Sequence, residues 1–210
     1  LSTAGVSTTT SRNYYLAAEI LARYTAAIGD HDFGVLFGYS AMEYRTWGWG
    51  VSKQGATDWT LNDLGTYETL SGSSSTAKNG WGLRSYFGRV NYAYKNRYLF
   101  EANLRADGSS RFGSNNRYGI FPSFSAGWKI HEERFMEGTE DWLSNLKLRA
   151  SWGKAGNNQG IGNYAWQAVY ATQNVVVDGS GSKGLYISSL SNADLKWEST
   201  ATTDIGLDMG

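Results

Sequence analysis

Hydrophobic and polar residues alternate along much of this sequence, most regularly between Arg97 and Asp107. Apolar side chains occupy the even positions of that run and polar side chains the odd positions, with Leu99 as the exception. A period of two places the two sets on opposite faces of a β-strand. The run therefore predicts a strand with one apolar face and one polar face.

The same alternation recurs elsewhere, and together the segments predict an all-β chain with about seven antiparallel strands. Clear alternation marks four further strands, at residues 85–94, 118–130, 146–153 and 200–209. Two more are expected at Asn13–Ile28 and Asp32–Trp47, where the alternation is less regular. Several of these strands are longer than the about 5 or 6 residues typical of globular proteins. Tilted strands of such length match the thickness of a bilayer, as in transmembrane β-barrels.

Short and long connections alternate between the expected strands. Tight turns are expected at 29–31 and 95–96, and long loops rich in Gly and Ser at 48–81 and 154–193. Short periplasmic turns and long extracellular loops are typical of an outer-membrane barrel. The segment 131–142 falls on the short-turn side and is expected to contain a helical turn.

Composition narrows the choice of function. Charged residues are only 18% of the chain, and 19 Lys plus Arg balance 19 Asp plus Glu. This balance provides no basic surface for nucleic acid, which is not an expected partner. The absence of cysteine excludes thiol chemistry, and with His31 and His131 as the only histidines we expect no metal site and no cofactor.

The sequence predicts no catalytic residues. Gly179, Gly181 and Gly184 match the G-x-G-x-x-G pattern, but the Ser-rich residues that follow are too few for the helix that would bind a pyrophosphate. A surface loop is favoured there. Glu132 and Glu133 could serve as acid and base, yet no neighbour in the sequence would orient them, so a solvent-exposed turn is favoured.

Tryptophans gather in and beside the first long loop. Trp47 and Trp81 lie at expected strand ends and fit an aromatic girdle at the level of the lipid headgroups. Trp49 and Trp59 lie deeper in the loop. They are candidates either for the same girdle or for stacking on an extracellular ligand.

Residues from Trp81 onward resemble the SusC/RagA class of TonB-dependent outer-membrane transporters, and residues 1–80 resemble it more loosely. The resemblance rests on ordered blocks: GRVNYAYKNRYLFEANLRADGSSRFGSNNRYGIFPSFSAGWKI from Gly88, EERFM, NLKLRASWGKAGNNQGIGNYAW from Asn145, and NADLKWESTATTDIGLDMG from Asn192. It implies a large transmembrane barrel of about 22 strands closed by a plug domain. The plug, the signal sequence and the closing strands are not recognised in these residues, so we expect 1–210 to be part of the barrel domain of a longer chain.

The resemblance also implies a function and partners. Such a protein would import glycans or oligopeptides across the outer membrane of a Gram-negative bacterium, powered by the TonB complex acting through the plug. A SusD-like surface lipoprotein would cover the barrel, and Trp49 and Trp59 would then contact the substrate or this lid.

In such a barrel the apolar strand faces would meet outer-membrane lipid, at Tyr98, Phe100, Leu104, Leu148, Ala150 and Trp152. The polar faces would line the lumen, at Arg97, Glu101, Asn103, Arg105, Asp107, Lys147 and Arg149. Two alternatives stay open: a passive porin or adhesin barrel, and a soluble lipocalin-like barrel with its apolar faces turned inward. An enzyme is the weakest alternative, because neither a nucleophile with its base nor a set of metal ligands can be assembled.

Overall fold

Antiparallel β-strands dominate the computed structural model, which describes residues 4–56, 60, 63–67, 69–70, 75–139, 141–177 and 179–210. Seven strands follow one another in a single sheet in the order β1-β2-β4-β5-β6-β7-β10. Their bounds are β1 Ala4–Ile28, β2 His31–Ala56, β4 Ser75–Tyr94, β5 Tyr98–Ser109, β6 Tyr118–Lys129, β7 Leu146–Asn157 and β10 Glu198–Met209. The expectation of about seven antiparallel strands is confirmed.

The chain divides into two compact units, one of residues 1–17 with 42–82 and one of residues 18–41 with 83–210. The first unit holds segments of β1, β2 and β4, the 3-10 turn η1 at Leu64–Thr66, and the two-residue strand β3 at Thr69–Leu70, which pairs with β2. In this unit the Trp81 ring lies 6.4 Å from Tyr15 and 6.3 Å from Tyr44, measured between ring centroids.

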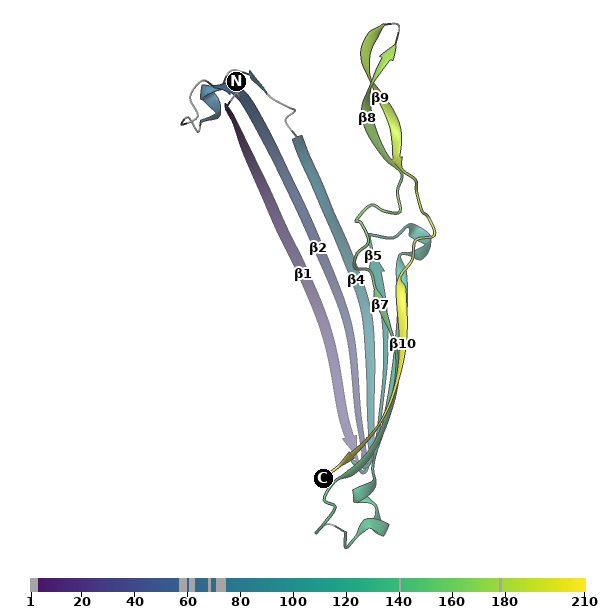
Figure 1. Ribbon diagram of the computed structural model, residues 1–210. Coiled ribbons are helices and arrows are strands. Elements are labelled where there is room, and N and C mark those ends of the chain that lie inside the picture. Colours follow the sequence, from purple (N-terminus) through teal and green to yellow (C-terminus); the bar gives the residue numbers. More distant parts are fainter. Residues whose placement is uncertain are drawn as a thin grey trace. The chain divides into compact units, whose positions relative to one another are not determined.

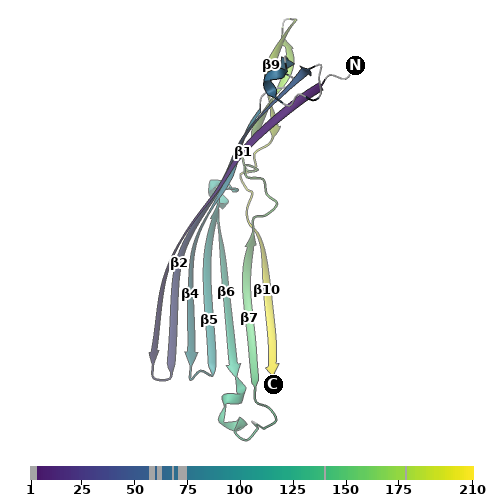
Figure 2. The same ribbon diagram turned by 90° about the vertical axis from the view of Figure 1, so that its left-hand side faces the viewer.

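The second unit holds β5, β6, β7 and β10 with segments of the other long strands, and Figure 2 shows β5, β6, β7 and β10 side by side. Its ladders are in register across the sheet: Asn103 lies opposite Arg89 on β4 and opposite Ser123 on β6, and Ser123 lies opposite Gly153 on β7. Because side chains alternate along each strand, this register aligns the odd-numbered residues of β4, β5, β6 and β7 on one face. We call this the polar face and its reverse the apolar face.

Large side chains on the apolar face are exposed in this chain. Phe100 and Leu104 of β5, Phe124 of β6 and Leu148 of β7 are among them. A sheet that leaves such side chains uncovered suits contact with lipid or with another apolar partner. Within the part of the chain that the structure describes, no helix is long and apolar enough to cross a membrane.

Tight turns join β1 to β2 and β4 to β5, as the sequence predicts. Lys95 and Asn96 have φ values of 52° and 51°, and Gly29 has a φ of 58°. Two successive residues with positive φ are typical of the type I′ hairpin turn. The β6–β7 connection contains the 3-10 turns η3, Ile130–Glu132, and η4, Arg134–Met136, so the predicted helical turn is also confirmed.

The long loops are shorter than the sequence predicts. The loop predicted at 48–81 is wrong in extent, because β2 continues to Ala56 and β4 starts at Ser75. The loop predicted at 154–193 is also wrong in extent: β7 continues to Asn157, and β8, Val169–Val177, pairs with β9, Ser180–Ser189, in a separate hairpin (Figure 1). Gly181 and Gly184 of the nucleotide-binding pattern lie inside β9, and no helix follows them among the described residues.

Candidate functional site

The polar face brings together most of the residues predicted to line a lumen. Glu101, Asn103, Arg105 and Asp107 follow one another on β5, at alternate positions. Lys147 and Arg149 lie on β7, opposite Lys129 and Gly127 of β6. The hydroxyl-bearing and small residues of β6, Ser123, Ser125 and Gly127, separate the two charged groups.

Two cavities open along this face of the second unit. We call the first the turn-side cavity, because it lies near the tight turns and is lined by Asp32, Glu101, Lys147 and Arg149. The second, the loop-side cavity, lies toward the loop ends of the strands and is lined by Arg89, Asn103, Arg105 and Asp107 among others. Their volumes are about 710 Å³ and about 690 Å³, each large enough for an oligosaccharide unit or a short peptide segment.

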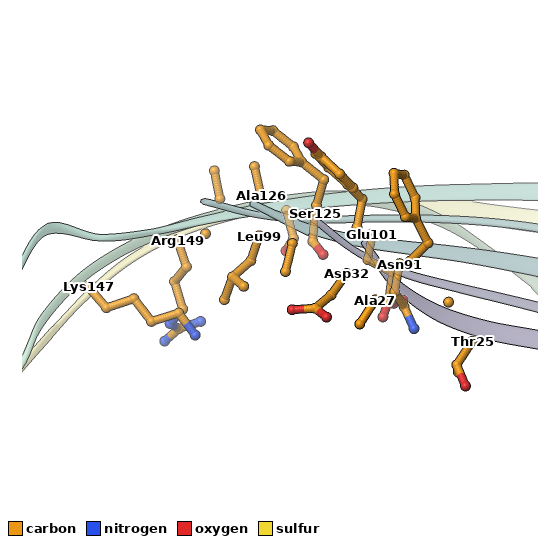
Figure 3. A pocket seen from close by; sticks show the side chains of 18 of the residues that line it. Thr25, Ala27, Asp32, Asn91, Leu99, Glu101, Ser125, Ala126, Lys147 and Arg149 are labelled. Carbon is orange, nitrogen blue, oxygen red and sulfur yellow. The ribbon is translucent and has the colours of Figure 1, made fainter. Parts of the chain in front are cut away.

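Opposite charges line the turn-side cavity. Lys147, Arg149 and Asp32 project to the same side of the strands, with Leu99 between them (Figure 3). The Arg149 Nε lies 3.3 Å from Asp208 Oδ1, while the Lys147 ammonium has no ion-pair partner within the described ranges. Gly127 leaves room for Lys147, because a Cβ there would lie 3.3 Å from the Lys147 Cε. This cavity therefore presents both positive and negative side chains.

Arg97 is the exception among the predicted residues, because it lies in the turn before β5 and binds a side chain of the β6–β7 connection. Its Nη1 donates to Glu133 Oε2 at 2.7 Å. Glu133 Oε1 accepts from the Tyr98 hydroxyl at 2.5 Å and from the Trp128 Nε1 at 2.9 Å. The prediction of a solvent-exposed turn is therefore wrong for Glu133, whose partners lie 5 to 36 residues away in sequence.

The three donors also set the charge state of Glu133. Hydrogen bonds from Tyr98 and Trp128, helped by the positive charge of Arg97, hold the pKa of Glu133 below its ordinary value despite partial desolvation. A carboxylate with this arrangement ties the β6–β7 connection to the ends of β5 and β6. Its place at the turn side gives it a structural role.

Replacing Glu133 by Gln in the full-length protein is expected to loosen the connection 130–145. The folded-state pKa of Glu133 is lowered from 4.5. The Glu133 carboxylate therefore stabilises the folded connection fully above pH 4.5, and this stabilisation is lost as the pH falls through the folded-state pKa. Wild-type protein should therefore gain pepsin cleavage sites in 130–145 as the pH falls from about 5 to about 2, as peptide mass spectrometry can show. Glu133→Gln should be cleaved there already at the upper pH, whereas Glu132→Gln should behave like wild type. Equal behaviour of the two variants would contradict this role.

Of the two tryptophans predicted to contact a ligand or lid, Trp49 lies among the described residues and Trp59 does not. Trp49 lies inside β2, two positions from Trp47, so its predicted place in a loop is wrong, and 44% of its surface is exposed. Trp81 lies inside β4 rather than at its end. Trp59 lies outside the described residues. Contacts of Trp49 and Trp59 with a ligand or a lid stay a prediction.

The loop side of the second unit carries a packed cluster that the sequence did not indicate. We call it the loop cluster; it consists of segments 110–117, 158–166 and 191–197. Phe112 is fully buried, and its ring centroid lies 5.2 Å from that of Trp197. Indole nitrogens of Trp197 and Trp166 donate to the carbonyls of Arg117 and Ser110, each at 3.1 Å. Rings and side-chain donors thus hold segments that are rich in Gly, Ser and Asn.

No group of three or more His, Asp or Glu side chains among the described residues is placed to hold a metal ion. The site consists instead of a polar sheet face with two cavities, an exposed apolar reverse, and connections that differ in length at the two ends of the strands. This combination is that of a barrel wall with a polar interior.

Residues 2–210 match the family model described as TonB dependent receptor-like, beta-barrel. The chain belongs to this family of TonB-dependent receptor barrels. It is 36% identical over 211 residues to the TonB-dependent receptor SusC of Bacteroides thetaiotaomicron, covering 96% of this chain and 20% of SusC. A TonB-dependent receptor of Formosa agariphila is 41% identical over 153 residues, which are 70% of this chain and 15% of that receptor.

A solved structure of the RagAB peptide transporter superposes on the chain with a TM-score of 0.87 at 31% identity, covering 97% of this chain and 22% of the other. The chain therefore spans about a fifth of the length of these relatives. The predicted resemblance to the SusC/RagA class is confirmed, and with it the outer membrane as the location of this TonB-dependent receptor barrel. The named relatives are receptors and transporters rather than enzymes.

Proposed function

We propose that this chain is part of the barrel wall of an active outer-membrane importer for glycans or oligopeptides. The observation that carries the proposal is the two-faced sheet, whose polar face bears charged and amide side chains on neighbouring strands while its reverse exposes Phe100 and Leu104. In a closed barrel the polar face lines the lumen and the apolar face meets lipid. The residues proposed to line the lumen are Glu101, Asn103, Arg105, Asp107, Lys147 and Arg149, with Arg97 at the turn-side rim.

The partners of the full-length protein follow from the same proposal. A plug domain fills the barrel and receives energy from the TonB complex, and a SusD-like lipoprotein covers the extracellular side. The solved relative was determined as a complex named RagAB and described as a peptide transporter, which supports a partner of this kind and a nutrient larger than a monosaccharide. The loop cluster and the hairpin β8–β9 lie at the side where this lipoprotein would dock.

The decisive experiment separates active import from passive diffusion. The full-length gene is deleted and then restored in its host, and uptake of a panel of labelled oligosaccharides and oligopeptides is measured in cells with and without TonB. Energy-dependent import predicts that uptake of at least one nutrient returns with the gene and falls to background without TonB. Uptake that persists without TonB would instead assign the protein to the passive porins.

A further inference from the structure

Two arginines of the polar face open toward one cavity near the loop ends of the strands. Arg89 of β4 and Arg105 of β5 both line the loop-side cavity, together with Asn103 and Ser123. Asn103 lies directly opposite Arg89, and Arg105 is two residues further along β5. Such diagonal neighbours in an antiparallel pair are about 7–8 Å apart, close enough for long side chains to meet on one ligand.

Three neighbours hold the Arg105 guanidinium in place. Its Nε donates to both carboxylate oxygens of Asp107, at 2.7 and 2.8 Å, and its Nη2 donates to Ser85 Oγ at 2.9 Å. The Phe87 ring lies 5.2 Å from the Arg105 Cζ. Asp107 is 8% exposed and Ser85 is fully buried, so this support does not depend on solvent-exposed side chains. The Nη1 of Arg105 has no hydrogen-bond partner among the described residues, and 41% of the side chain is exposed.

Arg89 is oriented in a similar way through a neutral group. Its Nε donates to Asn103 Oδ1 at 2.7 Å, and the Asn103 amide donates in turn to Glu101 Oε1 at 2.8 Å. The Arg89 Nε is 3.9 Å from Glu101 Oε1, too long for a hydrogen bond. Both terminal nitrogens of Arg89 have no hydrogen-bond partner in the part of the chain that the structure describes. Arg89 thus uses only Nε for its support and Arg105 uses Nε and Nη2, so both terminal nitrogens of Arg89 and the Nη1 of Arg105 stay available to a ligand.

We propose that Arg89 and Arg105 form a carboxylate-binding subsite on the inner wall of the barrel. The proposal rests on the proposed function, because the cavity faces the lumen only in a closed barrel. Guanidinium groups bind carboxylates through paired, charge-assisted hydrogen bonds, and a guanidinium that is already oriented loses less entropy on binding. Glu19 and Lys154 also line the cavity and offset one another in charge. Asp107 balances the charge of Arg105. Among the described residues, the charge of Arg89 is opposed only by Glu101, at 3.9 Å, so Arg89 supplies the attraction for an anion. The carboxylate would belong to a uronic acid of an oligosaccharide or to an acidic residue of a peptide.

Phenylglyoxal, which reacts with accessible guanidinium groups, tests this subsite in the full-length protein. The reaction is run on outer-membrane vesicles at constant ionic strength, and peptide mass spectrometry reads the modification of Arg89 and Arg105. Trigalacturonate is compared with its methyl ester, and acetyl-Ala-Glu-Ala-amide with its Gln counterpart. A bound carboxylate should slow the modification of both arginines by a factor of 1 + [L]/Kd, about fivefold at about four times Kd, while its neutral counterpart should not.

Arg117, an exposed residue of the loop cluster, is the internal control and should keep its rate. Protection by trigalacturonate identifies a sugar acid as the source of the carboxylate, and protection by acetyl-Ala-Glu-Ala-amide identifies an acidic peptide. Arg89→Gln, which leaves the support of Arg105 intact, should abolish the protection of Arg105. The subsite would be overturned if the neutral probes protected equally well, or if Arg117 were slowed as much as Arg89 and Arg105. It would also be overturned if Arg89→Gln left the protection of Arg105 unchanged, or if Arg105 never reacted. Uptake that requires TonB would still stand in each of these cases, so the two proposals fail separately.

Discussion

Leu104→Arg is expected to impair assembly of the full-length barrel, whereas Asn103→Arg, at the neighbouring position, should be tolerated. Leu104 lies near the middle of the twelve-residue strand β5 on the apolar face, and 56% of its surface is exposed. A charged side chain on the lipid face near the bilayer midplane costs about 2–4 kcal/mol. Asn103 points to the opposite face, where an added charge would meet the aqueous lumen.

Two measurements compare the variants. The folded fraction in native outer membranes is read from the heat-dependent mobility of the barrel in gel electrophoresis. The free energy of unfolding is measured by urea titration of the full-length protein in lipid vesicles. Leu104→Arg should lower the unfolding free energy by about 2–4 kcal/mol and reduce the folded fraction at the surface. If Asn103→Arg were the harmful substitution and Leu104→Arg were tolerated, the proposed orientation of the wall would be inverted.

The faces of the strands could be predicted from sequence because a strand has a side-chain period of two and the β4–β5, β5–β6, β6–β7 and β7–β10 ladders show no register shift. Leu99, which interrupts the alternation, lies on the polar face, where it packs beside Gly127 and forms an apolar patch in the turn-side cavity. Its departure from the pattern marks a local feature of the wall, not an error in the strand assignment.

Strand ends could not be predicted because backbone pairing does not require apolar side chains. The Gly- and Ser-rich ends of β2 and β4 have the composition of loops, yet they stay in the sheet. In the first unit Ser52 Oγ donates to Ser7 Oγ at 3.1 Å, a polar contact between β1 and β2 beyond the last regular alternation. The hairpin β8–β9 was missed for another reason: the apolar residues at the end of β8, VVV, do not alternate with polar ones, and Gly181 and Gly184 give the start of β9 the composition of a loop.

The charged residues of the wall were predictable one by one, but their partners were not. Arg97 was expected on the lumen face with the other charges, and its ion pair with Glu133, 36 residues away, depends on how the β6–β7 connection folds back. The support of Arg105 by Ser85, 20 residues away, likewise depends on the β4–β5 register. Spacing along one strand carries no information about such contacts across strands.

Phe112→Ala is expected to release the loop cluster while the strands stay folded. Phe112 is fully buried, in contact with Trp197, and Trp197 also packs edge-on against Phe121 of β6 at 5.4 Å between ring centroids. Removing a buried phenyl ring typically costs about 3–5 kcal/mol. Because Phe112 and Trp197 both lie in connections rather than in strands, the loss should appear as local opening and not as global unfolding.

Hydrogen exchange followed by mass spectrometry on the full-length protein in detergent can separate the two outcomes. Amides of 110–117 and 191–197 should exchange at least about 100-fold faster, since about 3 kcal/mol corresponds to that factor. Amides of β5 should keep their rates. Phe135→Ala is the matched control, because Phe135 is 68% exposed in the β6–β7 connection and its loss should leave the loop cluster unchanged. Faster exchange throughout β5 would mean that the loop cluster stabilises the wall itself. Unchanged exchange in 110–117 would mean that Trp166 and Trp197, with their backbone acceptors, hold these segments without the buried ring.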